Sequence, residues 1–235
     1  RRVAERFCLG LAEAGFTLCK GGVMAMNPLW RKTRTQWRDQ LGLWAQKRHG
    51  AALLHADIFL DLRAGWGDDA PAEALRGQAM DLLKQERAWA AMLAVQGAQL
   101  SVGLTLWGGF ADDEPGPGTR TDLKLHGLMP LVAAARLSAL RAGVPAPATP
   151  ARLAGLAAKG VLSASETARL QAAFATLLDA VLRQQLADLA AGLRPGNLVD
   201  TGAMPQAARV ALKDALKAVR SFAKATQAEL TGALW

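Results

Sequence analysis

The sequence predicts a mainly α-helical protein, with a mixed α/β region over residues 1–70 and a helical domain over residues 71–235. Short β-prone runs occur only in the first region, at 16–19, 23–26 and 56–62. The second region instead repeats apolar side chains every three or four residues, which is typical of amphipathic helices. Packing several such helices against one another predicts an antiparallel bundle.

The composition is that of an ordinary globular protein. The chain has 235 residues, of which 51% are hydrophobic and 20% charged, so extensive disorder is excluded. Cys8 and Cys19 are the only cysteines and form no C-x-x-C motif, which predicts reduced thiols in a cytoplasmic protein. No signal peptide is visible, and no apolar run reaches the roughly 18 residues of a membrane span.

Basic residues are concentrated in two places, and the net charge is +8. One is the segment 30–49. The other is a helical stripe whose members recur at intervals of three or four: Arg209, Lys213, Lys217, Arg220 and Lys224. Such charge suits phosphate-bearing partners, and a solvated helix face is the alternative.

The first region begins with a predicted helix over 1–14 that ends at Gly15. Asn27 and Pro28 predict the start of a second helix, with Asn27 as its N-cap. That helix places four apolar side chains in one stripe, which we interpret as core rather than as a surface for stacking bases: Trp30, Trp37, Leu41 and Trp44.

The second region contains five predicted helices and one long loop over 108–119. The helices cover 72–108, 121–142, 149–158, 163–192 and 205–232. Ser163 and Glu166 form a capping-box pattern at the start of the fourth. This helix presents a long apolar face, predicted to be core: Leu170, Phe174, Leu177, Val181, Leu182 and Leu186.

Asp61 is the most informative polar residue because it interrupts an apolar run. On a strand it shares one face with Asp57 and Arg63. A carboxylate on a central strand must be paired or bound to a metal ion, because its burial is otherwise costly. A surface pair with Arg63 on an edge strand remains equally open.

Other motifs are weaker. G-x-S-x-G, H-E-x-x-H and G-x-x-x-x-G-K-[ST] do not occur. Gly21 and Gly22 could cradle a phosphate, although a glycine pair is more often a turn. In the segment 124–130, Lys124 could point at an anion together with His126 and Arg136, or could simply extend from a helix end towards solvent.

Four segments, in order along the chain, carry a resemblance to a known family: LCKGGVMAMNPLWR, LLHADIFLDLRAGWGD, TDLKLHGLMPLVAAARLSAL and GLRPGNLVD. Together they resemble the C-terminal part of a bacterial family of nucleotidyltransferases, whose members often carry cyclic-nucleotide-binding and CBS domains upstream. The family is similar to the PII uridylyltransferases and the glutamine synthetase adenylyltransferases. The resemblance implies that residues 1–70 are the end of a polymerase-β-like α/β domain and residues 71–235 its helical substrate-binding domain.

The resemblance also implies site residues. Asp61 matches the third carboxylate of the superfamily, which binds Mg²⁺ beside a D-x-D pair that follows a Gly-Ser turn. No Gly-Ser turn with D-x-D precedes Asp61, so we expect a truncated chain that is inactive by itself. With the glycine pair considered above, six positions are candidates for nucleotide or substrate contacts: Arg63, Arg31, Lys124, Gly127, Gly21 and Gly22.

The implied activity is transfer of AMP or UMP, from ATP or UTP with Mg²⁺, to a protein or small-molecule acceptor. Nucleic acid and membrane are not expected partners, whereas a signalling protein and the upstream domains are. A non-catalytic helical module that binds a regulatory protein or nucleic acid is the alternative.

Overall fold

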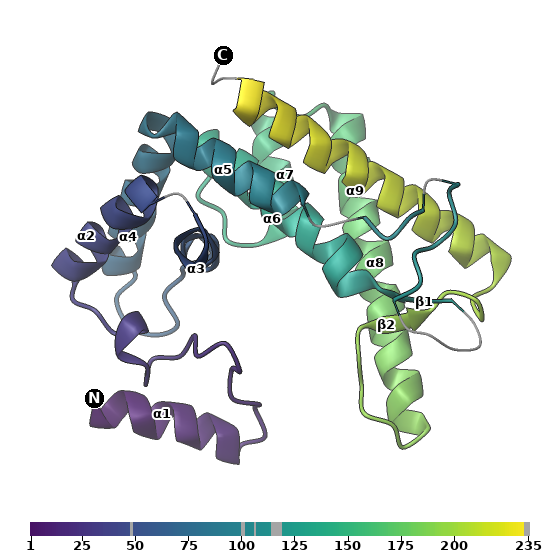
Figure 1. Cartoon of the computed structure of the whole chain (residues 1–235), viewed down its shortest axis with the longest axis horizontal. Helices are drawn as coiled ribbons and strands as arrows, with labels where there is room; N and C mark the ends of the chain where they lie inside the picture. The colour runs from purple at the N-terminus through teal and green to yellow at the C-terminus, as the bar shows by residue number, and fades with distance from the viewer. Residues whose placement is uncertain (48, 100–101, 106, 114–118, 233–235) are drawn as a thin grey trace. The chain divides into compact units, whose positions relative to one another are not determined.

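The structure is a computed structural model that describes residues 1–47, 49–99, 102–105, 107–113 and 119–232 (Figure 1). The chain divides into two compact units, Arg1–Leu43 and Trp44–Trp235. The fold is mainly α-helical, as predicted. Within the described residues, no helix has the length and apolarity that crossing a membrane requires.

The regular secondary structure of the first unit is helical. It contains α1 (Arg2–Glu13), the 3₁₀ helix η1 (Pro28–Trp30) and most of α2 (Arg34–Lys47). The strands predicted over 16–19 and 23–26 are wrong, because these residues form turns and irregular backbone. The predicted cap is confirmed, since the Asn27 side chain accepts a hydrogen bond from the amide of Leu29 at 3.0 Å, although it caps a single short turn.

Few side chains of the first unit are buried. Cys8 and Leu41 are buried, whereas the apolar face of α1 is open to solvent, with Val3 82% and Phe7 62% exposed. Both cysteines are free thiols, as predicted. The predicted tryptophan stripe is split, because Trp30 lies on η1 and Trp37 on α2, with ring centroids 6.0 Å apart.

The second unit begins with three helices: α3 (Ala51–Phe59), α4 (Ala70–Gln85) and α5 (Arg87–Ala98). The strand predicted over 56–62 is therefore wrong. Leu53, Ala56 and Phe59 are buried at intervals of three, which is the helical period, and a short apolar run does not distinguish the two periods. The predicted α/β remnant over residues 1–70 is thus absent from the described part of that segment.

The single helix predicted over 72–108 is two helices. The break is at Glu86, whose φ of −92° and ψ of 73° cannot continue a helix. Of the loop predicted over 108–119, residues 114–118 lie outside the described residues.

The helix predicted over 121–142 starts later than expected. Residues Arg120–Asp122 form β1, which pairs antiparallel with β2 (Leu198–Asp200), Thr121 opposite Val199. A π-helical turn, η2 (Lys124–Leu128), then leads into α6 (Met129–Arg141).

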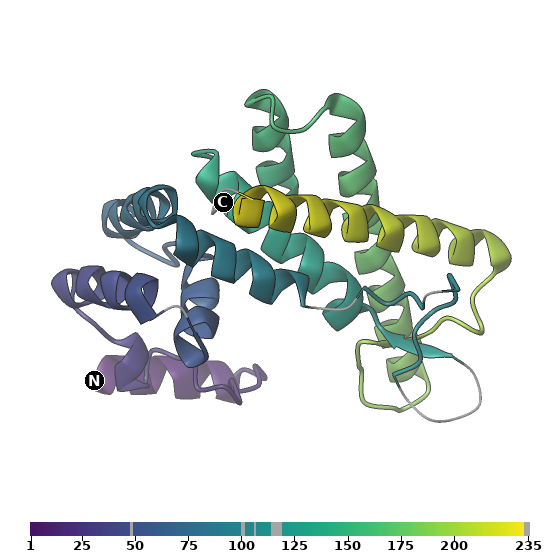
Figure 2. The same ribbon diagram turned by 45° about the horizontal axis from the view of Figure 1, so that its top comes forward.

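The last three helices follow the prediction closely: α7 (Thr149–Ala158), α8 (Ala164–Ala190) and α9 (Gln206–Gly232). The capping box is confirmed, with the Ser163 amide donating to the Glu166 carboxylate at 2.9 Å. Helices α7 and α8 lie side by side and run in opposite directions (Figure 2).

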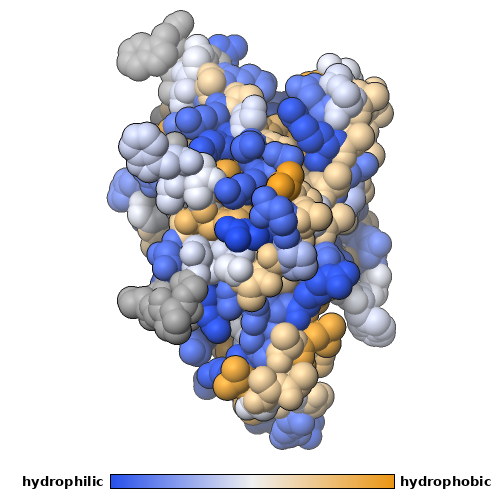
Figure 3. Space-filling view, turned by 90° about the vertical axis from the view of Figure 1, so that its right-hand side faces the viewer, coloured by the Kyte–Doolittle hydropathy of each residue, from blue (hydrophilic) through white to orange (hydrophobic). Residues whose placement is uncertain are grey.

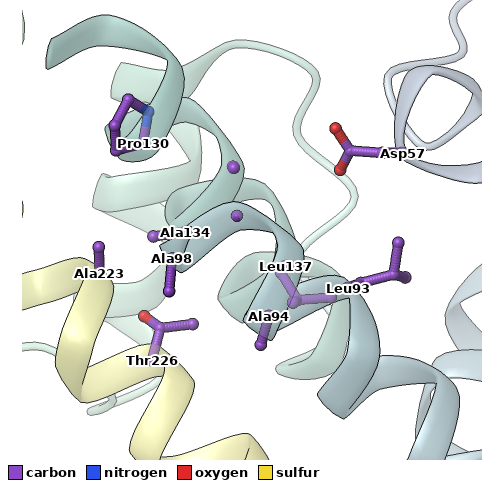
Figure 4. Close-up of a pocket in the computed structure, with 11 residues that line it drawn as sticks. Asp57, Leu93, Ala94, Ala98, Pro130, Ala134, Leu137, Ala223 and Thr226 are labelled. Carbon is purple, nitrogen blue, oxygen red and sulfur yellow. The ribbon is translucent and has the colours of Figure 1, made fainter. Parts of the chain in front are cut away.

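The apolar core of the second unit lies among α6, α7, α8 and α9. Leu131, Leu177, Leu212 and Leu216 are fully buried there. At the junction of α5, α6 and α9, small side chains such as Ala94 leave only a cavity of about 10 Å³ (Figure 4). The helices therefore pack closely, as expected for native interiors.

Tryptophans occupy opposite extremes in this unit. Trp89 on α5 is fully buried, whereas Trp66 and Trp107 are each 97% exposed. On the face shown in Figure 3, hydrophilic side chains predominate and hydrophobic ones are scattered among them.

Candidate functional site

Two carboxylates at the end of α3 meet two buried arginines. Asp57 lies in the last turn of α3, and Asp61 follows the helix. Arg136 of α6 contacts both, reaching Asp57 at 2.5 Å and also forming an ion pair with Asp61. Arg152 of α7 binds the other oxygen of Asp61 at 2.7 Å. This cluster of Asp57, Asp61, Arg136 and Arg152, the acid–arginine cluster, joins three helices.

Burial makes these contacts necessary. The side chains of Arg136 and Arg152 are 7% and 2% exposed, and a buried charge without a partner is strongly destabilising. Burial lowers the pKa of the Arg152 guanidinium, and the neighbouring Asp61 opposes that shift. The Arg152 Nε also donates to the carbonyl of Ala146 at 2.8 Å, which fixes the side chain.

The cluster explains why Asp61 interrupts an apolar run. The strand placement of Asp61 is wrong, but the expectation that its carboxylate is either paired or bound to a metal ion agrees with the geometry, in which it is paired. The predicted surface pair with Arg63 is replaced by pairs with Arg136 and Arg152. Arg63 itself is exposed.

The carboxylates of the described residues do not fit a Mg²⁺ site. Within that part of the chain, no group of three or more histidine, cysteine, aspartate or glutamate side chains is placed to hold a metal ion. Both oxygens of Asp61 already accept from arginines. The metal-ligand role of Asp61 stays a prediction, and we derive no chemical step through it.

A cleft of about 550 Å³ opens beside the cluster, between α3, α5, η2, α6 and α8. Its walls are largely apolar, including Leu128, Val132 and Phe174. Lys124 contributes an exposed ammonium at η2, and Asp57 and Arg136 line the inner side. An apolar cavity with a few convergent polar groups is the usual form of a ligand site.

Gly127 packs closely against α8, and its contact with substrate stays a prediction. It is buried, and a Cβ at this position would lie 2.7 Å from a methyl group of Leu177. The π-helical turn brings this glycine against α8, while Lys124 on the same turn faces the cleft. Only glycine fits without displacing Leu177.

The other residues predicted to contact nucleotide or substrate, Gly21, Gly22 and Arg31, lie in the first unit. Gly22 adopts a φ of +68° and its carbonyl accepts from the Asn27 amide group at 2.8 Å, so the glycine pair forms a turn. Arg31 donates to the carbonyls of Ala25 and Met26 at 3.3 and 3.1 Å. Gly21 lies in the same turn.

Comparison with known families gives two matches. The family model described as "Putative nucleotidyltransferase substrate binding domain" matches residues 87–230, more than half of the chain. The model described as "Putative nucleotidyltransferase DUF294" matches residues 1–51. The chain belongs to this nucleotidyltransferase family. No curated protein and no solved structure matches it.

Family membership supports a nucleotidyltransferase-like function in coarse terms. The substrate-binding-domain match includes η2, α6, α7 and α8, and so most of the cleft and both arginines of the acid–arginine cluster. Asp57 and Asp61 lie between the two matched segments. The domain boundary predicted at residue 70 stays a prediction.

Arg152 was missed by the sequence reasoning, although a signal exists. It is the one charged residue in α7, whose other side chains are small or apolar. A lone cation on a short apolar helix must find an anion when that helix packs, so the sequence indicated a partner for Arg152 without saying which residue it is.

Proposed function

We propose that this chain acts in nucleotidyl transfer and that the cleft between α3, α6 and α8 binds a substrate of that reaction. The carrying observation is that the family's substrate-binding domain contains a cleft of ligand size with an exposed lysine at its wall. The transferred group in this proposal is AMP or UMP, from ATP or UTP, and the acceptor is a protein or small molecule.

Each side of the cleft has a role in this proposal. The Lys124 ammonium provides a positive charge for a phosphate, and the apolar walls exclude water, which strengthens that attraction. Asp57 and Arg136 hold each other, so the acid–arginine cluster positions α3 against α6 and thereby keeps the cleft open.

Mg²⁺ remains part of the proposal for the complete reaction, together with the upstream cyclic-nucleotide-binding and CBS domains implied by the resemblance. Because the described carboxylates do not form a metal site, the test of nucleotide binding is designed to be read with and without Mg²⁺.

The test is titration of ATP and UTP into the chain and into Lys124→Ala, followed by calorimetry. We expect Lys124→Ala to weaken binding about tenfold, equivalent to about 1.4 kcal/mol. Lys159→Ala, which removes the same charge at the end of α7, is the matched control and should bind as the unaltered chain does. Equal binding by both variants would exclude Lys124 from the site.

A catalytic role for Asp61 needs a separate comparison. Asp61→Asn and Asp57→Asn each remove one charge from the acid–arginine cluster. Nucleotide-dependent pyrophosphate release is measured for both in the full-length protein, alongside their melting temperatures. A metal-ligand role requires loss of release in Asp61→Asn alone at matched stability. Parallel losses of activity and stability in both variants would assign Asp61 to structure.

The alternative, a non-catalytic binding module, drew support from the basic stripe. In the structure, Arg220 donates to the carbonyl of Leu104 at 2.8 Å, Lys213 lies over the Phe110 ring, and Lys217 pairs with Asp214. These local contacts account for much of the stripe without a nucleic-acid partner.

A further inference from the structure

The second half of α8 carries a row of exposed leucines. We call Leu178, Leu182, Leu186, Leu189 and Leu193 the leucine row; the first four lie on α8 and the last follows it. They are 38%, 49%, 66%, 59% and 59% exposed. The spacing of three or four residues places the four leucines of α8 along one side of the helix. The predicted core face of this helix is thus only partly core, because Leu170 and Leu177 are buried whereas Leu182 and Leu186 are not.

The leucine row continues the wall of the cleft. Leu178 and Leu182 line the cleft, together with the partly exposed Leu54 of α3 and Met129 of α6. Leu186 and Leu189 extend the same apolar side beyond it. From Leu178 to Leu189 the row runs about 17 Å along the helix axis. An apolar strip of this length that continues beyond the groove matches the face of a partner helix.

The charges around this surface are positive. Lys124 lies at the cleft and Arg194 is exposed beside Leu193. The acidic groups nearby are engaged: Asp57 with Arg136, Asp179 with Arg183, and Asp188 with the Gln184 amide and the Gly196 amide. With a chain charge of +8, a second copy would be repelled, whereas an acidic segment would be attracted.

We propose that the leucine row and the adjoining cleft bind an amphipathic helix of another protein, with apolar residues on its docking face and Asp or Glu residues beside them. This inference goes beyond the proposed nucleotidyl transfer. Because the helix would share the cleft and Lys124 with the nucleotide, the two ligands should compete for this part of the surface. The apolar faces supply the burial, and Lys124 and Arg194 select the acidic flanks.

The test uses a synthetic pool of leucine-striped helical peptides whose flanking positions are either Glu or Lys. The pool is passed over the immobilised chain, and recovered peptides are counted by mass spectrometry. We expect Glu-flanked peptides to exceed Lys-flanked ones about tenfold, as complementary charge selects among similar apolar faces. In Leu186→Gln/Leu189→Gln, recovery of Glu-flanked peptides should fall by about tenfold, since central apolar contacts carry most of the affinity.

Val210→Gln is the matched control, because Val210 is a partly exposed apolar residue on α9 outside the leucine row. It should leave recovery unchanged. Equal recovery of Glu- and Lys-flanked peptides, no recovery of either, or equal losses in Val210→Gln would overturn the proposal. Light scattering tests the other possible occupant of the leucine row, a second copy of this chain. If the chain is a dimer and Leu186→Gln makes it monomeric, the leucine row is a dimer interface and the proposal is wrong. ATP binding by the Leu186→Gln/Leu189→Gln variant separates this result from the proposed function, since neither leucine lines the cleft.

Discussion

The units Arg1–Leu43 and Trp44–Trp235 obtain their order in different ways. The second has a continuous apolar core among α6, α7, α8 and α9, and its acid–arginine cluster joins the end of α3 to α6 and α7. The first has two buried apolar side chains, and its most amphipathic helix, α1, leaves its apolar face exposed. A family match to both segments therefore does not imply equal stability, because stability depends on how much apolar surface each segment buries.

The largest expected difference between the units is in hydrogen exchange. Helix α1 has 12 residues, and an isolated helix of that length is marginal in water. We expect α1 amides to exchange at least about 100-fold faster than those of the buried helix α6, because local opening of α1 exposes little additional apolar surface. Exchange followed by mass spectrometry measures both; comparable protection would show that α1 is covered in solution.

The acid–arginine cluster provides the next test. Asp61→Ala leaves Arg136 and Arg152 without this carboxylate and should lower the free energy of unfolding by about 2 kcal/mol, less than for a fully buried pair because the Asp61 side chain is 40% exposed. Urea unfolding measures the change.

A compensating variant sharpens that result. In Asp61→Leu/Arg152→Met the buried charge and its partner are both removed, and stability should return towards the original value, because an apolar replacement of an ion pair is often neutral. If the double variant is less stable than Asp61→Ala, the interpretation of unpaired buried charge is incorrect.

Two glycine substitutions compare the units directly. Gly127→Ala places a methyl group 2.7 Å from Leu177 and should cost about 1–3 kcal/mol by overpacking. Gly10→Ala, within α1, meets nothing within 4 Å and should stabilise that helix by up to about 1 kcal/mol. Gly127→Ala should shift the main urea transition, whereas Gly10→Ala should change only the hydrogen-exchange rates of α1. A shift of the main transition by Gly10→Ala would mean that the two units unfold together.

The smallest expected effect is at the start of α8. The Ser163 hydroxyl and amide lower the pKa of Glu166 below its ordinary value of 4.5. Its contribution to stability is therefore present above pH 4.5 and is lost as the pH falls through the lower, folded-state pKa. Glu166→Gln lacks this ionisable group and should be less stable than the original chain at about pH 5. The difference in melting temperature between the two should shrink as the pH falls from about 5 to about 3, which thermal unfolding measures. An unchanged gap over that range would show that the carboxylate hydrogen bonds are not formed in solution.

The long helices and their caps could be predicted from sequence, because periodicity and capping are local. Ser163, Glu166 and the bounds of α7 are examples. The region around Asp61 could not, since a seven-residue apolar run fits either a helix or a strand and only packing decides between them. The partners of Asp61 come from 75 residues or more along the chain, as Arg136 shows, and no local pattern specifies that pairing.

The contrast in exposure among the tryptophans gives the protein an optical signal of unfolding. The sequence contains no tyrosine, so ultraviolet emission comes from tryptophan alone. Trp89 passes from a dry helix junction to water on unfolding, whereas Trp66 and Trp107 are already in water. The shift of the emission wavelength on unfolding should therefore report mainly on the buried tryptophans Trp44 and Trp89, and Trp89→Phe should remove part of that shift.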